Sequence, residues 1–134
     1  MMSETSHLQF IIMEVKDAAD IPNHDVGYWA DENAGVRVVH TAKLGNVDYE
    51  FLVLLHEMIE QHLCVRDGVS AAAVDAWDAE HWDAPDGPGA LPDAPYHRQH
   101  GRAEMVEMAA ASLLGVDWQQ YDEEIARKCY GVSE

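Results

Sequence analysis

The sequence predicts an α+β fold in which N-terminal antiparallel strands precede a long helix and about three further helices. Side chains typical of strands are concentrated before residue 44, and helix-capping patterns occur only after it. A stretch rich in proline and glycine then interrupts the helical half. With 134 residues, 48% of them hydrophobic, the chain fits one domain covering residues 1–134.

The first segments carry the side chains of β-strands. Residues 8–15, with the sequence LQFIIMEV, are rich in β-branched and aromatic residues, which predicts a strand. A loop containing Pro22 follows. Residues 26–30 and 36–43 predict a hairpin, because Gly35 before the second of them suits its turn. These strands form the sheet of the predicted fold.

Helices are predicted where a short polar side chain precedes a helical run. Such a side chain accepts hydrogen bonds from the free amides of the first helical turn. The predicted caps are Asp48 for a helix over 48–65, Ser70 for one over 70–82, and Asp117, with Gln120 completing a capping-box-like pattern, for one over 117–129. A further helical pattern of polar and apolar side chains begins at His97.

Residues 83–95 form a predicted loop. The sequence DAPDGPGALPDAP holds four prolines, two glycines and three aspartates, a composition that disfavours both helix and sheet. Its end leads directly into Tyr96 and His97. Two interpretations stay open: a lid that shapes a substrate site, and a plain connector.

The segment His56-Glu57-Met58-Ile59-Glu60 predicts half of a metal site. On a helix, residues i and i+4 lie about 40° apart, so His56 and Glu60 point the same way and can bind one ion. Glu57 projects beside them. The preceding residues 51–55 are apolar, so this helix is predicted to be buried, where unpaired histidine and glutamate side chains are costly. Burial therefore favours a bound metal over a solvated surface pair.

His97, His100 and Glu104 predict the other half of the site. Their i, i+3, i+7 spacing keeps the three side chains within an arc of roughly 60° on one helix face. Two such faces turned toward each other would place imidazoles and carboxylates around one point. His62 lies roughly 120° around its helix from His56, so we exclude it from this site.

The sequence HEMIE resembles the HExxH active-site helix of the zincin metallopeptidases, with Glu60 in the place of the second histidine. The chain is also similar to small phage and prophage proteins of this zincin-like type. The resemblance implies that His56 and Glu60 bind the metal and that Glu57 is the general base. It implies a later ligand from His100 or Glu104, and a strand beside the metal helix that holds an extended substrate by strand addition.

The predicted donor set fits a divalent metal ion. Catalytic zinc commonly has two histidines, one glutamate and a water as ligands, and His56, Glu60 and His100 supply the same protein donors in a different order. Binding by His97 or Glu104 as well would close the fourth position. Zinc is therefore the first expectation, and manganese or iron also suits a site of two carboxylates and two imidazoles.

Further side chains have weaker claims to a role. Asp78 and His81 lie three residues apart on a predicted helix, which suits either support for a ligand or pairing on the surface. His40 and Tyr96 are candidates for stabilising an oxyanion. The sequence contains no GxGxxG, P-loop or nucleophile-elbow pattern.

The charge of the chain excludes two classes of partner. Asp and Glu number 25 against 8 Lys and Arg, so the net charge is −17. Such a surface repels phosphate backbones and anionic membranes, and we expect neither nucleic acid nor a membrane as a partner.

Several features predict a cytoplasmic protein. The chain has no apolar run long enough to span a membrane, and residues 1–7 have no basic region before a hydrophobic stretch. Cys64 and Cys129 lack CxxC spacing, which argues against a disulfide framework or a cysteine zinc site.

Three functional hypotheses follow from these patterns. The favoured one is a metal-dependent hydrolase that cleaves a peptide or amide bond of a peptide or protein substrate with metal-activated water. The second is a non-catalytic, metal-stabilised interaction domain of phage or prophage origin, with four protein ligands closing the site. The third is a di-metal carboxylate protein, although the repeated ExxH signature of that class is missing. The sequence leaves the oligomeric state open.

Overall fold

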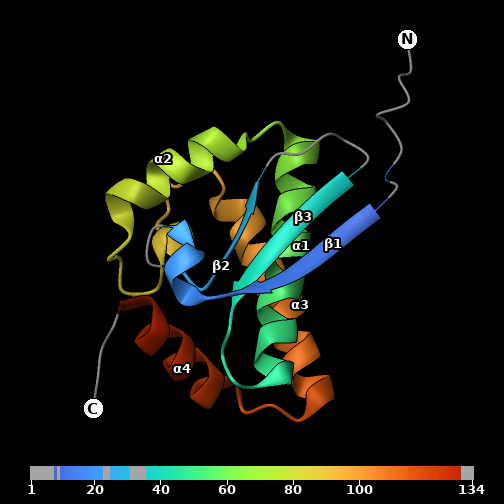
Figure 1. Ribbon diagram of the computed structural model, residues 1–134. Coiled ribbons are helices and arrows are strands. Elements are labelled where there is room, and N and C mark those ends of the chain that lie inside the picture. The colour runs from blue at the N-terminus through green and yellow to red at the C-terminus, as the bar shows by residue number, and fades with distance from the viewer. Residues whose placement is uncertain (1–7, 9, 23–24, 31–35, 131–134) are drawn as a thin grey trace.

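Three strands and then four α-helices make up the described part of the chain, residue 8 and residues 10–22, 25–30 and 36–130 of a computed structural model. This order confirms the α+β class predicted from the sequence. The elements are β1 (Phe10–Lys16), the 3-10 helix η2 (Ala18–Asp20), β2 (Gly27–Ala30), β3 (Val36–Ala42), α1 (Val47–Asp67), α2 (Ala71–His81), the 3-10 helix η4 (Pro88–Ala90), α3 (His97–Leu114) and α4 (Trp118–Tyr130) (Figure 1).

The strands form one mixed sheet in the order β1-β3-β2. β2 pairs antiparallel with β3, from Gly27 opposite Thr41 to Ala30 opposite Val38, which confirms the predicted pairing. The predicted turn at 31–35 lies outside the described residues. β1 runs parallel to β3, so the prediction of wholly antiparallel strands is wrong. The chain reverses between β1 and β2 and again between β2 and β3, and two reversals leave β1 and β3 pointing the same way.

Capping side chains begin three of the helices. Ser70 and Asp117 each accept a hydrogen bond from the amide three residues on, at 3.1 and 3.0 Å, as predicted. The N-cap of α1 is Asn46, which accepts such a bond at 3.1 Å, so the prediction of Asp48 is wrong. Asp48 lies instead in the first turn, where its negative charge interacts favourably with the helix dipole. The predicted loop 83–95 contains no strand and no helix longer than the single turn of η4.

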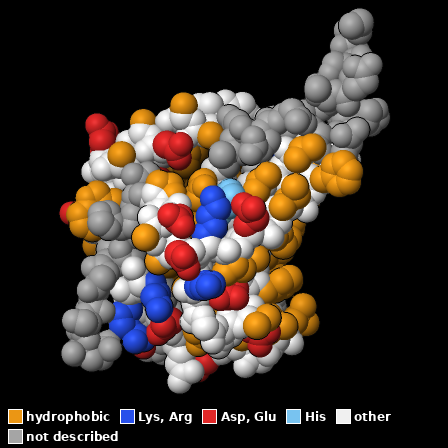
Figure 2. Space-filling model, viewed as in Figure 1, with side chains coloured by type: hydrophobic (Ala, Val, Ile, Leu, Met, Phe, Trp, Pro, Cys, Tyr) orange, Lys and Arg blue, Asp and Glu red, His pale blue; other side chains and the backbone are white. Residues whose placement is uncertain are grey.

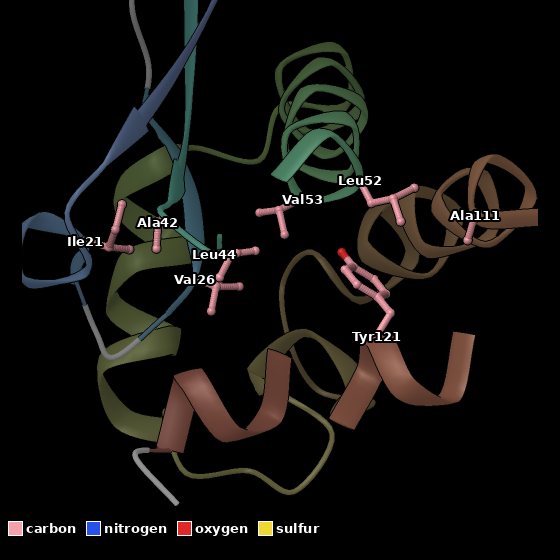
Figure 3. Close-up of a cluster of buried hydrophobic side chains, with 8 residues drawn as sticks. All are labelled: Ile21, Val26, Ala42, Leu44, Leu52, Val53, Ala111 and Tyr121. Carbon is pink, nitrogen blue, oxygen red and sulfur yellow. The ribbon is translucent and has the colours of Figure 1, made fainter. Parts of the chain in front are cut away.

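Helix α1 lies between the sheet and α3 (Figure 1). One cluster of buried apolar side chains joins the end of the sheet to three helices; it contains Ile21, Val26, Ala42, Leu44, Leu52, Val53, Ala111 and Tyr121 (Figure 3). A second cluster joins Trp29 and Val39 of the sheet to Leu54 and the buried side chain of Cys64 on α1. Both clusters pack against α1 close to His56, Glu57 and Glu60. This packing determines where those side chains point.

Strand β1 is the exception to this burial. Phe10, Ile12 and Met13 are 62%, 45% and 41% exposed, and hydrophobic side chains gather over this flank of the molecule (Figure 2). Within the described residues, no further strand pairs with the outer edge of β1, and β2 forms the opposite edge of the sheet. In the same part of the chain, no helix combines the length and apolar content needed to cross a membrane.

Gly27 occupies a position too tight for a side chain. A Cβ atom there would lie 2.5 Å from Cγ1 of Val53 and 3.0 Å from the carbonyl oxygen of His40. We expect Gly27→Ala to lower the free energy of unfolding by about 1–3 kcal/mol, because the backbone of β3 cannot give way easily. Urea denaturation followed by circular dichroism measures this change.

The matched control is Gly101→Ala in α3. A Cβ atom at Gly101 meets nothing within 4 Å, and alanine favours a helix interior over glycine by up to about 1 kcal/mol. This variant should be as stable as the parent protein or more so. Equal losses from Gly27→Ala and Gly101→Ala would contradict the close approach of β2 to α1.

Candidate metal centre

Helices α1 and α3 bring their polar side chains together inside the protein. His56, Glu57 and Glu60 lie on α1 and are buried, because this part of the helix packs against the sheet and α3. His100 lies in the first turn of α3 and is half-buried. The two helix faces that were predicted to form the site therefore lie against each other in the structure.

Three donor groups converge in this cluster. Glu60 Oε2 lies 3.1 Å from His56 Nε2 and 3.1 Å from His100 Nδ1. The potential ligand atoms of these three residues all lie within 4.8 Å of one another. Only small adjustments are needed for all three atoms to reach one ion. The structure thus brings together three of the five residues predicted as ligands.

The second polar atom of two of the donors, His56 and Glu60, is held by another side chain. Glu107 Oε1 of α3 lies 2.7 Å from His56 Nδ1, and Tyr121 donates its hydroxyl proton to Glu107 Oε2 at 2.5 Å. Tyr121 extends from α4 toward the other helices (Figure 3). On the other side, Trp29 Nε1 donates to Glu60 Oε1 at 2.9 Å. A carboxylate on the nitrogen away from the ion is the usual way of orienting a metal-binding histidine.

Burial and pairing set the charges of the donors. Burial alone would lower the pKa of His56, but the hydrogen bonds to Glu107 and Glu60 outweigh it and hold that pKa well above its usual value. Burial would raise the pKa of Glu60, but the bonds to His100 and His56 outweigh it and hold the pKa well below the usual range. A metal ion would replace the proton of His56, because ligands bind metals in their deprotonated forms.

The cluster lies in the wall of a cavity of about 510 Å³. The residues that line it come from the start of β2, from all four helices and from the loop with η4. Glu57 is one of them, next to the donors on α1. Burial and the neighbouring charge of Glu60 raise the pKa of Glu57 well above its usual value. A carboxyl group in this state suits proton transfer at the cavity wall.

Two more carboxyl groups face the same cavity. Asp25, just before β2, accepts a hydrogen bond from the amide of Val26 at 2.9 Å, and burial raises its pKa to about 6. Asp78 of α2 accepts a hydrogen bond from the hydroxyl of Tyr96, and burial raises its pKa to about 7. Both groups hold their protons more tightly than exposed aspartates do.

The other two predicted ligands lie outside the group of three. His97 is exposed, and its Nδ1 lies 3.0 Å from the carbonyl oxygen of Gly89. Glu104 is an exposed side chain that lines the cavity but does not join the three donors. The donor group within the described residues is therefore two histidines and one glutamate.

Of the side chains with weaker claims to a role, some line the cavity and others do not. Asp78 and Tyr96 line the cavity, whereas His81 stacks on Trp77 with its ring centroid 3.8 Å away. His40 stacks on Tyr28 and does not line the cavity, so nothing supports an oxyanion role for it. His62 is exposed, in agreement with its exclusion from the site.

Sequence reasoning missed several residues that build the site. Glu107 follows His100 by seven residues, two helical turns on the same face, and this spacing could have revealed it. Gly89 is needed because a Cβ atom there would lie 2.6 Å from Cγ of His100. Asp25, Trp29 and Tyr121 have no local pattern that marks them, because they reach the site only through the tertiary fold.

No protein-family model, curated protein or solved structure matches the chain. The chemistry of the site therefore has to follow from its own side chains.

The donor set fits a divalent metal ion. Two imidazoles and one carboxylate match the protein ligands of many catalytic zinc sites. His56 and Glu60 each have a partner on the atom that faces away from the common point, and their inward-facing atoms contact each other there. The surrounding carboxyl groups add negative potential that favours a cation.

The bond between Glu107 and His56 gives a direct test of this arrangement. We expect Glu107→Gln to weaken zinc binding by about 10- to 100-fold, because the amide orients the ring without the negative charge that makes it a better donor. Competition with a chromogenic chelator measures the affinity. Glu104→Gln on the same helix is the control, and it should change the affinity less than about threefold. A larger loss from Glu104→Gln would make Glu104 a ligand.

Proposed function

We propose that this protein is a metal-dependent hydrolase that cleaves a peptide or amide bond. It binds one divalent ion, with zinc as the first expectation, through His56, Glu60 and His100. The observation that supports this best is the number and position of the donors: among the described residues, three protein ligands converge at the wall of a cavity. Three protein ligands and an open position characterise catalytic zinc, whereas structural zinc sites are closed by four.

The residues around the donors have complementary tasks. His56, Glu60 and His100 would hold a metal ion that would serve as a Lewis acid toward the scissile carbonyl and toward water. Glu57 would accept the proton of the attacking water at its carboxylate and pass that proton to the leaving amine. Glu107 and Trp29 hold His56 and Glu60 in position. The hydroxyl of Tyr96 stays protonated, because burial and the charge of Asp78 raise its pKa.

Strand β2 supports a zincin-like mode of substrate binding. It is an edge strand, and residues 26–29 line the cavity beside the donors. An extended peptide can pair with such an edge through backbone hydrogen bonds, which places one of its amide groups in the cavity. The zincin-like assignment is supported by this edge strand together with the HEMIE helix next to it.

The first test is metal binding. We expect the purified protein to bind roughly one zinc ion per chain and to melt at a higher temperature when zinc is added, because a ligand that binds only the folded state stabilises it. His56→Ala and His100→Ala should each remove most of this shift. His62→Ala on the exposed side of α1 is the control and should keep it. Elemental analysis and differential scanning fluorimetry measure both quantities, and similar shifts in all three variants would rule out the proposed ligand set.

The second test separates an enzyme from a metal-stabilised domain. Glu57→Gln keeps the size of the side chain and removes the proton acceptor, so zinc content and melting temperature should stay near those of the parent protein. Hydrolysis of a peptide found in a library screen should fall by about 100-fold or more, the usual contribution of a general base. Release of the metal by Glu57→Gln would make Glu57 a fourth ligand and favour the metal-stabilised interaction domain.

A further inference from the structure

The cavity beside the donors is strongly acidic. Among the described residues that line it, nine are Asp or Glu, two are His and none is Lys or Arg. Glu60 and Glu107 are paired with histidines, but Asp25, Glu57 and Asp78 are not. A single divalent ion held by His56, Glu60 and His100 leaves these three carboxyl groups without an ion pair to any described side chain.

These three carboxyl groups do not form a second metal site. In the part of the chain that the structure describes, the group whose ligand atoms approach closely enough for one ion is His56, Glu60 and His100. Asp25, Glu57 and Asp78 come from different elements and enclose a wider space. A wider space with several acceptors suits an organic cation, since ammonium and guanidinium groups donate several hydrogen bonds in different directions.

Glu57 provides an independent indication of a bound partner. Its side chain lines the cavity and the residue is only 9% exposed, yet none of the described residues donates a hydrogen bond to it. Because the residue lines the cavity, its carboxyl oxygens are open to a donor that arrives with a ligand.

The other walls of the cavity suit the rest of a basic side chain. Trp29, Tyr96 and Trp82 line it together with the acids. Aromatic rings bind the methylene stem of lysine or arginine by apolar contact and attract the head group electrostatically. Burial raises the pKa of Asp25 to about 6 and that of Asp78 to about 7, and a cationic head group between the two carboxyl groups would lower both values.

We infer that the cavity selects a peptide with a lysine or arginine side chain, whose cationic head group binds between Asp25 and Asp78 beside the metal donors. The claim that this peptide is cleaved rests on the proposed function. The binding preference itself depends on the charge and shape of the cavity.

The test compares two peptides that differ in one charged group. Acetyl-Ala-Lys-Ala-amide and acetyl-Ala-norleucine-Ala-amide have side chains of the same carbon length, and only the first carries an ammonium group. Isothermal titration of the zinc-loaded full chain should give a dissociation constant roughly tenfold lower for the lysine peptide. The titration is repeated on protein dialysed against a chelator, and metal content is measured in both samples.

Three variants locate the preference within the cavity. Asp25→Asn and Asp78→Asn should each reduce the ratio of the two dissociation constants by about threefold or more. Asp93→Asn is the control, because Asp93 is an exposed acid in the loop before α3 that does not line the cavity. If Asp78→Asn disturbs folding through its bond to Tyr96, Asp25→Asn decides the question alone.

Equal affinities for the two peptides, or no binding of either, would overturn this inference. An equal fall in the preference for the lysine peptide in the Asp93→Asn and Asp25→Asn variants would also overturn it. Preference for the lysine peptide by a protein that contains no metal after reconstitution, or that never cleaves the peptide, would support this inference and contradict the proposed function. If the protein binds zinc and cleaves the norleucine peptide as well as the lysine peptide, the proposed function is supported and this inference is contradicted.

Discussion

The carboxylate of Glu60 is the interaction on which the relative positions of the sheet, α1 and α3 depend. One oxygen accepts a hydrogen bond from Trp29 in β2, and the other lies between His56 of α1 and His100 of α3. A carboxylate at 5% exposure is stable only with such partners, because an unpaired buried charge is destabilising by several kcal/mol. The sheet and α3 therefore cannot shift along α1 without leaving this charge uncompensated.

A second carboxylate extends the same network to α4. Glu107 contacts His56 on one side and the hydroxyl of Tyr121 on the other. The ring of Tyr121 packs in the apolar cluster with Leu52, so one residue belongs to both the core and the polar network. The candidate site is consequently built from the contacts that hold the helices together. Its geometry and the stability of the fold should respond to the same substitutions.

Local patterns in the sequence are sufficient to predict the parts of the fold that depend on neighbouring residues. The caps at Ser70 and Asp117 are examples, because a side chain three residues before an amide decides them. The cap of α1 is harder to predict, because Asn46 and Asp48 both belong to the residue types that cap helices and lie only two residues apart. The direction of β1 depends on where the chain crosses the sheet, and no local pattern contains that information.

The candidate site shows the same division between local and distant information. Helical spacing is enough to group His56 with Glu60 and to place His100 on a second polar stripe. Helical spacing does not tell which of His97 and His100 is a ligand. That depends on the loop before α3, where the carbonyl oxygen of Gly89 contacts the ring of His97. Asp25 and Trp29 reach the cavity from the sheet side, far along the chain from the donors on α1. Their contribution follows from tertiary packing alone.

The exposed edge of the sheet has a further consequence. Apolar edge strands are the places where separate chains most readily associate, and β1 carries such side chains on both faces. The cavity lies beside β2, at the far edge, with β3 between them. Self-association at high protein concentration would therefore begin on the side away from the cavity, and each associated chain would keep an accessible cavity.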